Sequence, residues 1–122
     1  MRILVVDDTE EVRVVVEELL ICYGHEVRSA SSGKEALALL ESYAPDIVIT
    51  NRRMPEMSGE ELIRHIKESK PHLPIVLMTG DDLSPTERRV ITGAGASAIV
   101  IKPFSIEELA KAVLHGRTWE NA

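Results

Sequence analysis

Short runs of apolar residues alternate along the chain with longer segments in which apolar positions recur every three or four residues. The short runs predict β-strands, and the longer segments predict amphipathic helices. Such alternation is typical of repeated βα units around a parallel sheet. Val27 alternates with charged neighbours, which indicates a strand at the sheet edge. We predict an α/β fold with strands at Ile3–Val6, Glu26–Ser29, Ile47–Thr50, Ile75–Thr79 and Ala98–Ile101.

The predicted helices begin at hydroxyl side chains that favour a helix start. These residues are Thr9, Ser32, Ser84 and Ser105. A glutamate follows each of the last two by three residues, which matches a capping box. Apolar stripes on the first and last helices are expected to face the core. The stripes are Val12, Val15, Val16, Leu19 and Leu20, then Ile106, Leu109, Val113 and Leu114.

The chain has the length and composition of one folded domain. It has 122 residues, of which 44% are hydrophobic and 28% charged, and these values exclude intrinsic disorder. The apolar pattern stops after Leu114, so we predict a domain at 1–116 and a C-terminal tail or linker stub at 117–122. Trp119 either belongs to this tail or folds back on the domain.

Charge and aromatic content narrow the class of partner. The net charge is −6 and aromatic residues make up 3%, which argues against direct nucleic-acid binding. No apolar run is long enough to cross a bilayer, so neither membrane insertion nor secretion is expected. Cys22 lies in an apolar helical pattern and is predicted to be a buried structural thiol, consistent with a reducing cytoplasm.

Polar side chains follow four of the predicted strands. They are Asp7 and Asp8, Asn51, Thr79 and Lys102. Ligands of an open parallel sheet bind outside the carboxyl ends of its strands, so these residues are candidates for one site. Two adjacent carboxylates suit Mg²⁺. Taken singly, each residue also has an ordinary structural role, as a helix-capping acid, a strand-end threonine or a solvated amine.

An ordered set of motifs in this chain resembles the receiver domains of two-component response regulators, over essentially its whole length. The matching segments are Leu4-Val5-Val6-Asp7-Asp8, the stretch from Asp46 to Pro55 continuing through Gly59, Thr79-Gly80, Gly93-Ala94 and Lys102-Pro103-Phe104. Each motif is weak by itself, whereas the set in this order is specific. The resemblance implies a flavodoxin-like (βα)5 fold with strand order 2-1-3-4-5.

The resemblance also implies roles for the strand-end residues. An aspartate after the third strand would accept a phosphoryl group from a phosphohistidine. Asp8 would bind Mg²⁺ directly and Asp7 through water, with the acceptor residue and the carbonyl of Arg53 completing the protein ligands. Lys102 would pair with one phosphoryl oxygen, and the Thr79 hydroxyl would donate to another, so that donors surround the developing negative charge.

The implied partners are a histidine kinase or phosphotransfer protein and an output domain or effector protein. A homodimer is also compatible with this family. We therefore expect a bacterial, cytoplasmic signalling module rather than an enzyme.

The chain departs from the family at the acceptor position, which is Asn51. A neutral amide oxygen is a far poorer nucleophile than a carboxylate, so ordinary phosphorylation should fail. Asn51 can still offer its carbonyl oxygen to a metal, and we expect Mg²⁺ binding to be weakened rather than abolished. Ile99 stands where the family often has an aromatic residue, so the usual aromatic switching surface is not expected.

Two origins of Asn51 remain open. It is either an engineered or recent replacement in a competent receiver, or native to a degenerate receiver that signals by protein contact alone. The presence of Asp7, Asp8, Thr79 and Lys102 favours recent replacement. An Mg²⁺-dependent phosphatase is a remote alternative, because this chain has no substrate-capping insertion and no carboxylate nucleophile after the third strand. A flavin-binding module is also disfavoured, because the loop after the first strand is acidic and offers no cradle for a flavin phosphate.

The remaining charged residues have ordinary interpretations. Arg52-Arg53 is expected to be solvated, whereas Arg88-Arg89 is a candidate for partner contact on the fourth helix. No metal or catalytic role is expected for the histidines, which are His25, His65, His72 and His115.

Overall fold

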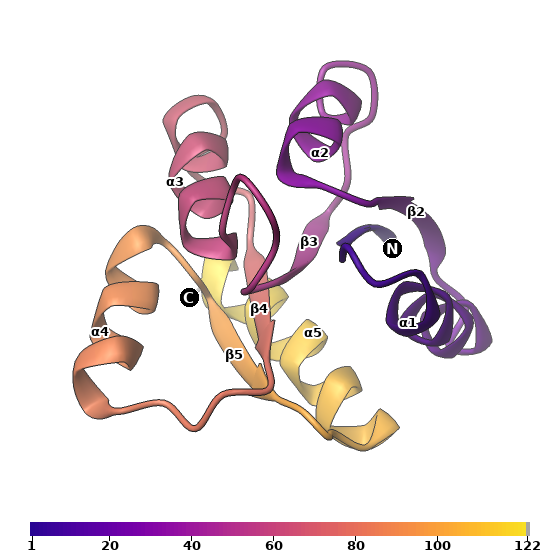
Figure 1. Cartoon of the computed structure of the whole chain (residues 1–122). Helices are drawn as coiled ribbons and strands as arrows, with labels where there is room; N and C mark the ends of the chain where they lie inside the picture. The colour runs from indigo at the N-terminus through magenta and orange to yellow at the C-terminus, as the bar shows by residue number, and fades with distance from the viewer. Residues whose placement is uncertain (122) are drawn as a thin grey trace.

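Five parallel strands form one sheet in the order β2-β1-β3-β4-β5 (Figure 1). The computed structural model describes the backbone of residues 1–121 and their side chains, except those of Ile106 and residues 115–121. The strands are β1 (Arg2–Val6), β2 (Glu26–Ala30), β3 (Ile47–Asn51), β4 (Ile75–Thr79) and β5 (Ala98–Ile101). The predicted fold class and strand order are confirmed, and β2 lies at an edge as Val27 indicated.

A helix follows each strand. The helices are α1 (Glu10–Cys22), α2 (Gly33–Leu39), α3 (Gly59–Ser69), α4 (Pro85–Ala94) and α5 (Ile106–Asn121). The side chains of Ser32 and Ser84 accept hydrogen bonds from backbone amides in the first turn of α2 and α4, as predicted. Thr9 makes no side-chain capping bond. Sequence reasoning overlooked the capping box of Ser58 at the start of α3. No helix in the described part of the chain is long and apolar enough to span a membrane.

The helices cover both faces of the sheet (Figure 1). On β1, Ile3 and Val5 pack with residues of α1 and α5, whereas Leu4 and Val6 pack with residues of α2, α3 and α4. All four side chains are fully buried. Burial of each such side chain contributes roughly 1.5–3 kcal/mol, so the alternating apolar strands drive formation of this three-layer architecture.

The face of α1 that reaches the core is narrower than predicted. Val16 and Leu20 are buried, but Val15 is 55% exposed. Residues four apart lie above one another on a helix, whereas adjacent residues point about 100° apart, which turns Val15 away from the sheet. Cys22 is also exposed, because it lies two residues after Leu20 and points to the opposite side. The prediction of a buried structural thiol was wrong.

The last helix differs from its prediction in a similar way. Leu109 and Val113 are buried, but Leu114 is 64% exposed. The side chain of Ile106 lies outside the described residues. Helix α5 continues to Asn121, through the segment for which we predicted a tail or linker stub at 117–122. Residue 122 and the Trp119 side chain also lie outside the described residues, so the domain boundary after residue 116 stays a prediction.

The narrow core face of α1 predicts different effects for two neighbouring valines. Val16→Ala should lower the free energy of unfolding by about 2 kcal/mol, because it removes buried methyl groups and leaves a cavity. Val15→Ala should change it by less than about 0.5 kcal/mol. Urea denaturation, monitored by circular dichroism, measures the free energy of unfolding of both variants. Equal losses of stability would contradict the assigned orientation of α1.

Candidate functional site

The polar strand-end residues meet where the carboxyl ends of β1, β3, β4 and β5 converge. Lys102 lies after β5 and precedes Pro103 with a cis peptide bond. Its Nζ donates a hydrogen bond to Asn51 Oδ1 at 2.9 Å and lies 3.6 Å from Asp7 Oδ2. The fold therefore brings together three predicted site residues that lie far apart in the sequence.

Asp7 contributes a carboxylate that is completely buried. Its Oδ1 accepts a hydrogen bond from the Thr9 backbone amide at 3.0 Å, whereas Oδ2 has no hydrogen-bond partner among the described residues. A buried carboxylate oxygen in this state favours a nearby cation. Asp8, the next residue, is exposed, so the acidic pair combines a buried oxygen with an accessible one.

The Asn51 amide is held by two contacts at the end of β3. Its Oδ1 accepts from Lys102, and its Nδ2 donates to the Arg53 carbonyl at 2.9 Å. The reversed orientation would place the amide NH₂ against an ammonium and the amide oxygen against a carbonyl. The hydrogen bonds thus fix the orientation of the amide, with its NH₂ group on the Arg53 carbonyl.

Thr79 is 1% exposed and closes β4. Its hydroxyl donates to Asp81 Oδ2 at 3.3 Å and accepts from the Asp81 amide at 3.1 Å. The Thr79 carbonyl accepts from the Lys102 amide at 2.7 Å, but the Thr79 hydroxyl is bonded to Asp81, a residue that sequence reasoning did not select. A carboxylate two residues after a strand-end hydroxyl is the signal that could have identified it.

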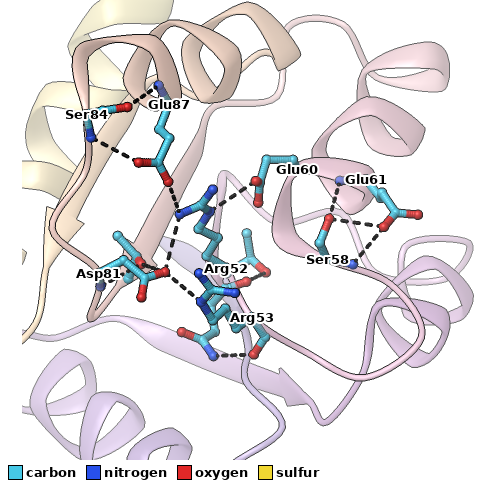
Figure 2. A network of polar contacts seen from close by, with 11 residues as sticks. Arg52, Arg53, Ser58, Glu60, Glu61, Asp81, Ser84 and Glu87 are labelled. Carbon is cyan, nitrogen blue, oxygen red and sulfur yellow. Dashed lines mark hydrogen bonds and ion pairs between the residues drawn. The ribbon is translucent and has the colours of Figure 1, made fainter.

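The two arginines after Asn51 differ sharply in environment. The Arg52 side chain is 15% exposed and pairs with Glu60, Asp81 and Glu87, as Figure 2 shows. Arg53 is 74% exposed and contacts Asp81 at 2.7 Å. The prediction of a solvated pair was therefore wrong for Arg52, because its acidic partners come from distant segments.

The ion pairs perturb the titration of these groups. Hydrogen bonding from the Arg53 guanidinium lowers the pKa of Asp81. The Ser84 backbone amide lowers the pKa of Glu87, and Arg52 lowers it further. Burial opposes the charged form of Arg52, but its hydrogen bonds to Glu60 and Glu87 keep its pKa raised.

Close backbone contact joins α3 to the site. A Cβ atom at Gly59 would lie 2.6 Å from the Asn51 carbonyl oxygen and 3.0 Å from the Arg52 Cα. The Gly59 amide also donates to the Arg52 carbonyl at 2.7 Å. Glycine is needed here because any side chain would push α3 away from the end of β3.

The histidines lie apart from these residues. The His25 Nδ1 contacts the N-terminal amine at 3.0 Å, and its pKa is lowered by burial and by that charge. His65 lies on α3 and His72 in the following turn, and the side chain of His115 lies outside the described residues. No cluster of three histidine, cysteine or acidic side chains suited to a metal occurs among the described residues.

Residues 3–114 match the family described as the response regulator receiver domain. Over 109 residues the chain is 40% identical to the response regulator MprA of Mycolicibacterium vanbaalenii and 39% identical to MprA of Mycobacterium avium. Both alignments cover 89% of this chain and 47% of the relative. The chain thus spans about half the length of these relatives.

Solved structures with the same fold include single receivers and part of a longer protein. The chemotaxis protein CheY4 of Vibrio cholerae matches with a TM-score of 0.88 and 31% identity, over 93% of this chain and 95% of that chain. A receiver domain protein from Clostridium thermocellum matches at 0.87 and 30%, over 98% and 96%. NtrX of Brucella abortus matches at 0.90 and 29%, over 98% of this chain and 27% of that one.

The two contacts of Glu87 predict its titration. Its pKa should lie below the ordinary value of 4.5, so its contribution to stability is present at neutral pH and is lost as pH falls through the lowered pKa. Arg52→Gln should raise this pKa without restoring 4.5, because the Ser84 amide still donates to the carboxylate. Nuclear magnetic resonance of the Glu87 carboxyl carbon measures the change.

Arg53→Gln serves as the control for that titration, since Arg53 contacts Asp81 and not Glu87. An unchanged Glu87 pKa in Arg52→Gln, or an equal rise in both variants, would contradict the assignment.

Proposed function

The chain belongs to the response regulator receiver domain family, and we propose that position 51 is its phosphoacceptor position, silenced here by an amide. The observation that carries this proposal is the 2.9 Å contact between Lys102 Nζ and Asn51 Oδ1. It places an ammonium against the side-chain oxygen at the end of β3, beside the buried Asp7 carboxylate. A phosphoryl group formed on that oxygen would lie next to the Lys102 ammonium.

The proposed reaction requires aspartate at position 51. A carboxylate oxygen would attack the phosphorus of a phosphohistidine, the new O–P bond would form, and the imidazole nitrogen would leave with the electrons of the broken P–N bond. Lys102 would neutralise one phosphoryl oxygen. The Thr79 hydroxyl would donate to another after leaving Asp81, so that fixed donors face the charge developing at phosphorus.

Magnesium fits the oxygen donors of this corner. Asp8 would bind Mg²⁺ directly and Asp7 through water, with the position 51 side chain and the Arg53 carbonyl as the other protein ligands. The buried Oδ2 of Asp7, which accepts no hydrogen bond among the described residues and lies 3.6 Å from Lys102 Nζ, supports a further cation here. The bound ion would supply positive charge that stabilises the transferring phosphoryl group.

Asn51 opposes both steps. Its amide oxygen is neutral and already accepts from Lys102, and its NH₂ group occupies the Arg53 carbonyl. A metal at the Arg53 carbonyl would compete with this NH₂ donor for the same oxygen. We infer that this form takes no phosphoryl group by the ordinary route and binds Mg²⁺ more weakly than an aspartate form.

A phosphorylation-independent interaction module is the alternative. The same two Asn51 hydrogen bonds favour it, because they satisfy the Asn51 side chain without metal or phosphate. In either case we propose a histidine kinase or phosphotransfer protein as the upstream partner of the aspartate form. An output domain or effector protein would receive the signal, and Arg88-Arg89 on the exposed side of α4 is a candidate contact. Homodimer formation is a further proposal.

Asn51→Asp should restore phosphoryl transfer. Incubation with Mg²⁺ and acetyl phosphate should add one phosphoryl group to Asn51→Asp, detected by intact mass, and none to the Asn51 chain or to Asn51→Ala. Adding Lys102→Met to Asn51→Asp removes the ammonium beside the acceptor and should slow phosphoryl uptake by about 10²-fold or more. Failure of Asn51→Asp to react would favour the phosphorylation-independent module.

Asn51→Asp should also bind Mg²⁺ about tenfold or more tightly than the Asn51 chain. The added carboxylate charge would attract the metal, and two unit charges about 4 Å apart interact by about 1–4 kcal/mol. Calorimetric titration at fixed ionic strength measures the difference. Adding Glu41→Gln, an exposed acid near the end of α2, returns the net charge to −6 without touching the site. The gain should survive in that double variant, and its loss would assign the effect to overall charge.

A further inference from the structure

Arg52 lies at a junction of three segments that are distant in the sequence. Its Nε donates to Glu60 Oε2 on α3 at 3.1 Å. Its Nη1 contacts Asp81 Oδ2 after β4 at 3.3 Å and Glu87 Oε2 on α4 at 3.2 Å. The Arg52 side chain is 15% exposed and that of Glu60 14%, so part of this network is shielded from water. One guanidinium thus links the end of β3 to α3 and α4.

Asp81 connects that junction to the candidate phosphoryl site. Its Oδ2 atom accepts from the Thr79 hydroxyl, from Arg52 and from Arg53 (Figure 2). A threonine hydroxyl has one proton to donate. A phosphoryl oxygen that receives this proton must therefore take it from Asp81.

Glu87 connects the junction to α4. Its Oε1 accepts from the Ser84 amide at 3.1 Å and completes the capping box of the helix, while Oε2 faces Arg52. The loop between Thr79 and α4 is consequently held at both ends, by Asp81 and by Glu87, and both hold it to Arg52. A change at the Thr79 hydroxyl therefore acts directly on Asp81, which shares the Arg52 guanidinium with Glu87.

We propose that Arg52 is a charge latch that holds α4 in its unphosphorylated position and releases it when a phosphoryl group takes the Thr79 hydroxyl. The proposal rests on the receiver function proposed above. When the hydroxyl turns to the phosphoryl group, Asp81 Oδ2 loses that donor and keeps only its arginine contacts. The Arg52 pairs with Asp81 and Glu87 then rearrange. Coupling through charges would replace an aromatic side chain, since Ile99 occupies that position on β5.

Glu87→Gln is the sharpest test, because it removes the charge that faces Arg52 while glutamine still fits a capping box. Glu61→Gln is the matched control, since Glu61 completes the equivalent box of Ser58 on α3 (Figure 2) and contacts no arginine among the described residues. Both are made in Asn51→Asp. Hydrogen exchange of Pro85–Ala94 is measured before and after acetyl phosphate, with phosphoryl uptake read by intact mass in the same samples.

Before phosphorylation, α4 should exchange roughly two- to fivefold faster in Glu87→Gln than in Asn51→Asp alone, and Glu61→Gln should leave α4 unchanged. Phosphorylation should accelerate α4 exchange in Asn51→Asp and in the control, but add little in Glu87→Gln. Equal α4 exchange in all unphosphorylated variants, or the same acceleration by phosphorylation in Glu87→Gln and the control, would overturn the latch.

Arg52→Gln and Arg53→Gln in the unaltered Asn51 chain give a second test that needs no phosphorylation. The first should accelerate α4 exchange and the second should not, and equal behaviour would overturn the role of Arg52. Absence of phosphoryl uptake in Asn51→Asp would instead count against the proposed function, and this arginine comparison would still decide whether Arg52 holds α4.

Discussion

Burial of the sheet on both faces is the constraint on which the site depends. Side chains of β1, β3 and β4 are covered by helices on either side, so charged groups can reach solvent only at the strand termini. Even the buried Thr50 hydroxyl is satisfied locally, by donating to the Asn51 carbonyl. The parallel arrangement puts those ends at one edge, and Asp7, Asn51 and Lys102 meet there because no other part of the central strands can hold them.

At this edge, one amide determines which bonds the site can make. An aspartate at position 51 would add a second carboxylate beside Lys102, next to that of Asp7, and a metal would relieve the repulsion between the acids. The Asn51 amide removes that charge and supplies an NH₂ donor for the Arg53 carbonyl. The Asn51 side chain is thereby satisfied by hydrogen bonds, whereas Oδ2 of Asp7 accepts no hydrogen bond among the described residues and has the Lys102 ammonium as its nearby charge.

The arginine after Asn51 extends the influence of the site beyond its own residues. Arg52 contacts α3 and α4 through acidic side chains, and Gly59 allows the start of α3 to approach the end of β3. Charges act over longer distances than packing contacts. Separating the partly buried guanidinium from one of its acids removes an ion pair that offsets the desolvation of that acid. An ionic network is thus a physical alternative to aromatic packing for linking this site to α4.

Local patterns in the sequence determined the strands, the edge position of β2 and the strand-end residues, because strand burial and helix capping depend on near neighbours. The tertiary structure alone decided the surroundings of individual side chains. Val15 and Cys22 are exposed because the sheet covers a narrower face of α1 than the apolar pattern has. Arg52 is only partly exposed because its partners Asp81 and Glu87, 29 and 35 residues away, converge on it. Such ion pairs depend on distances that exist only after the chain has folded.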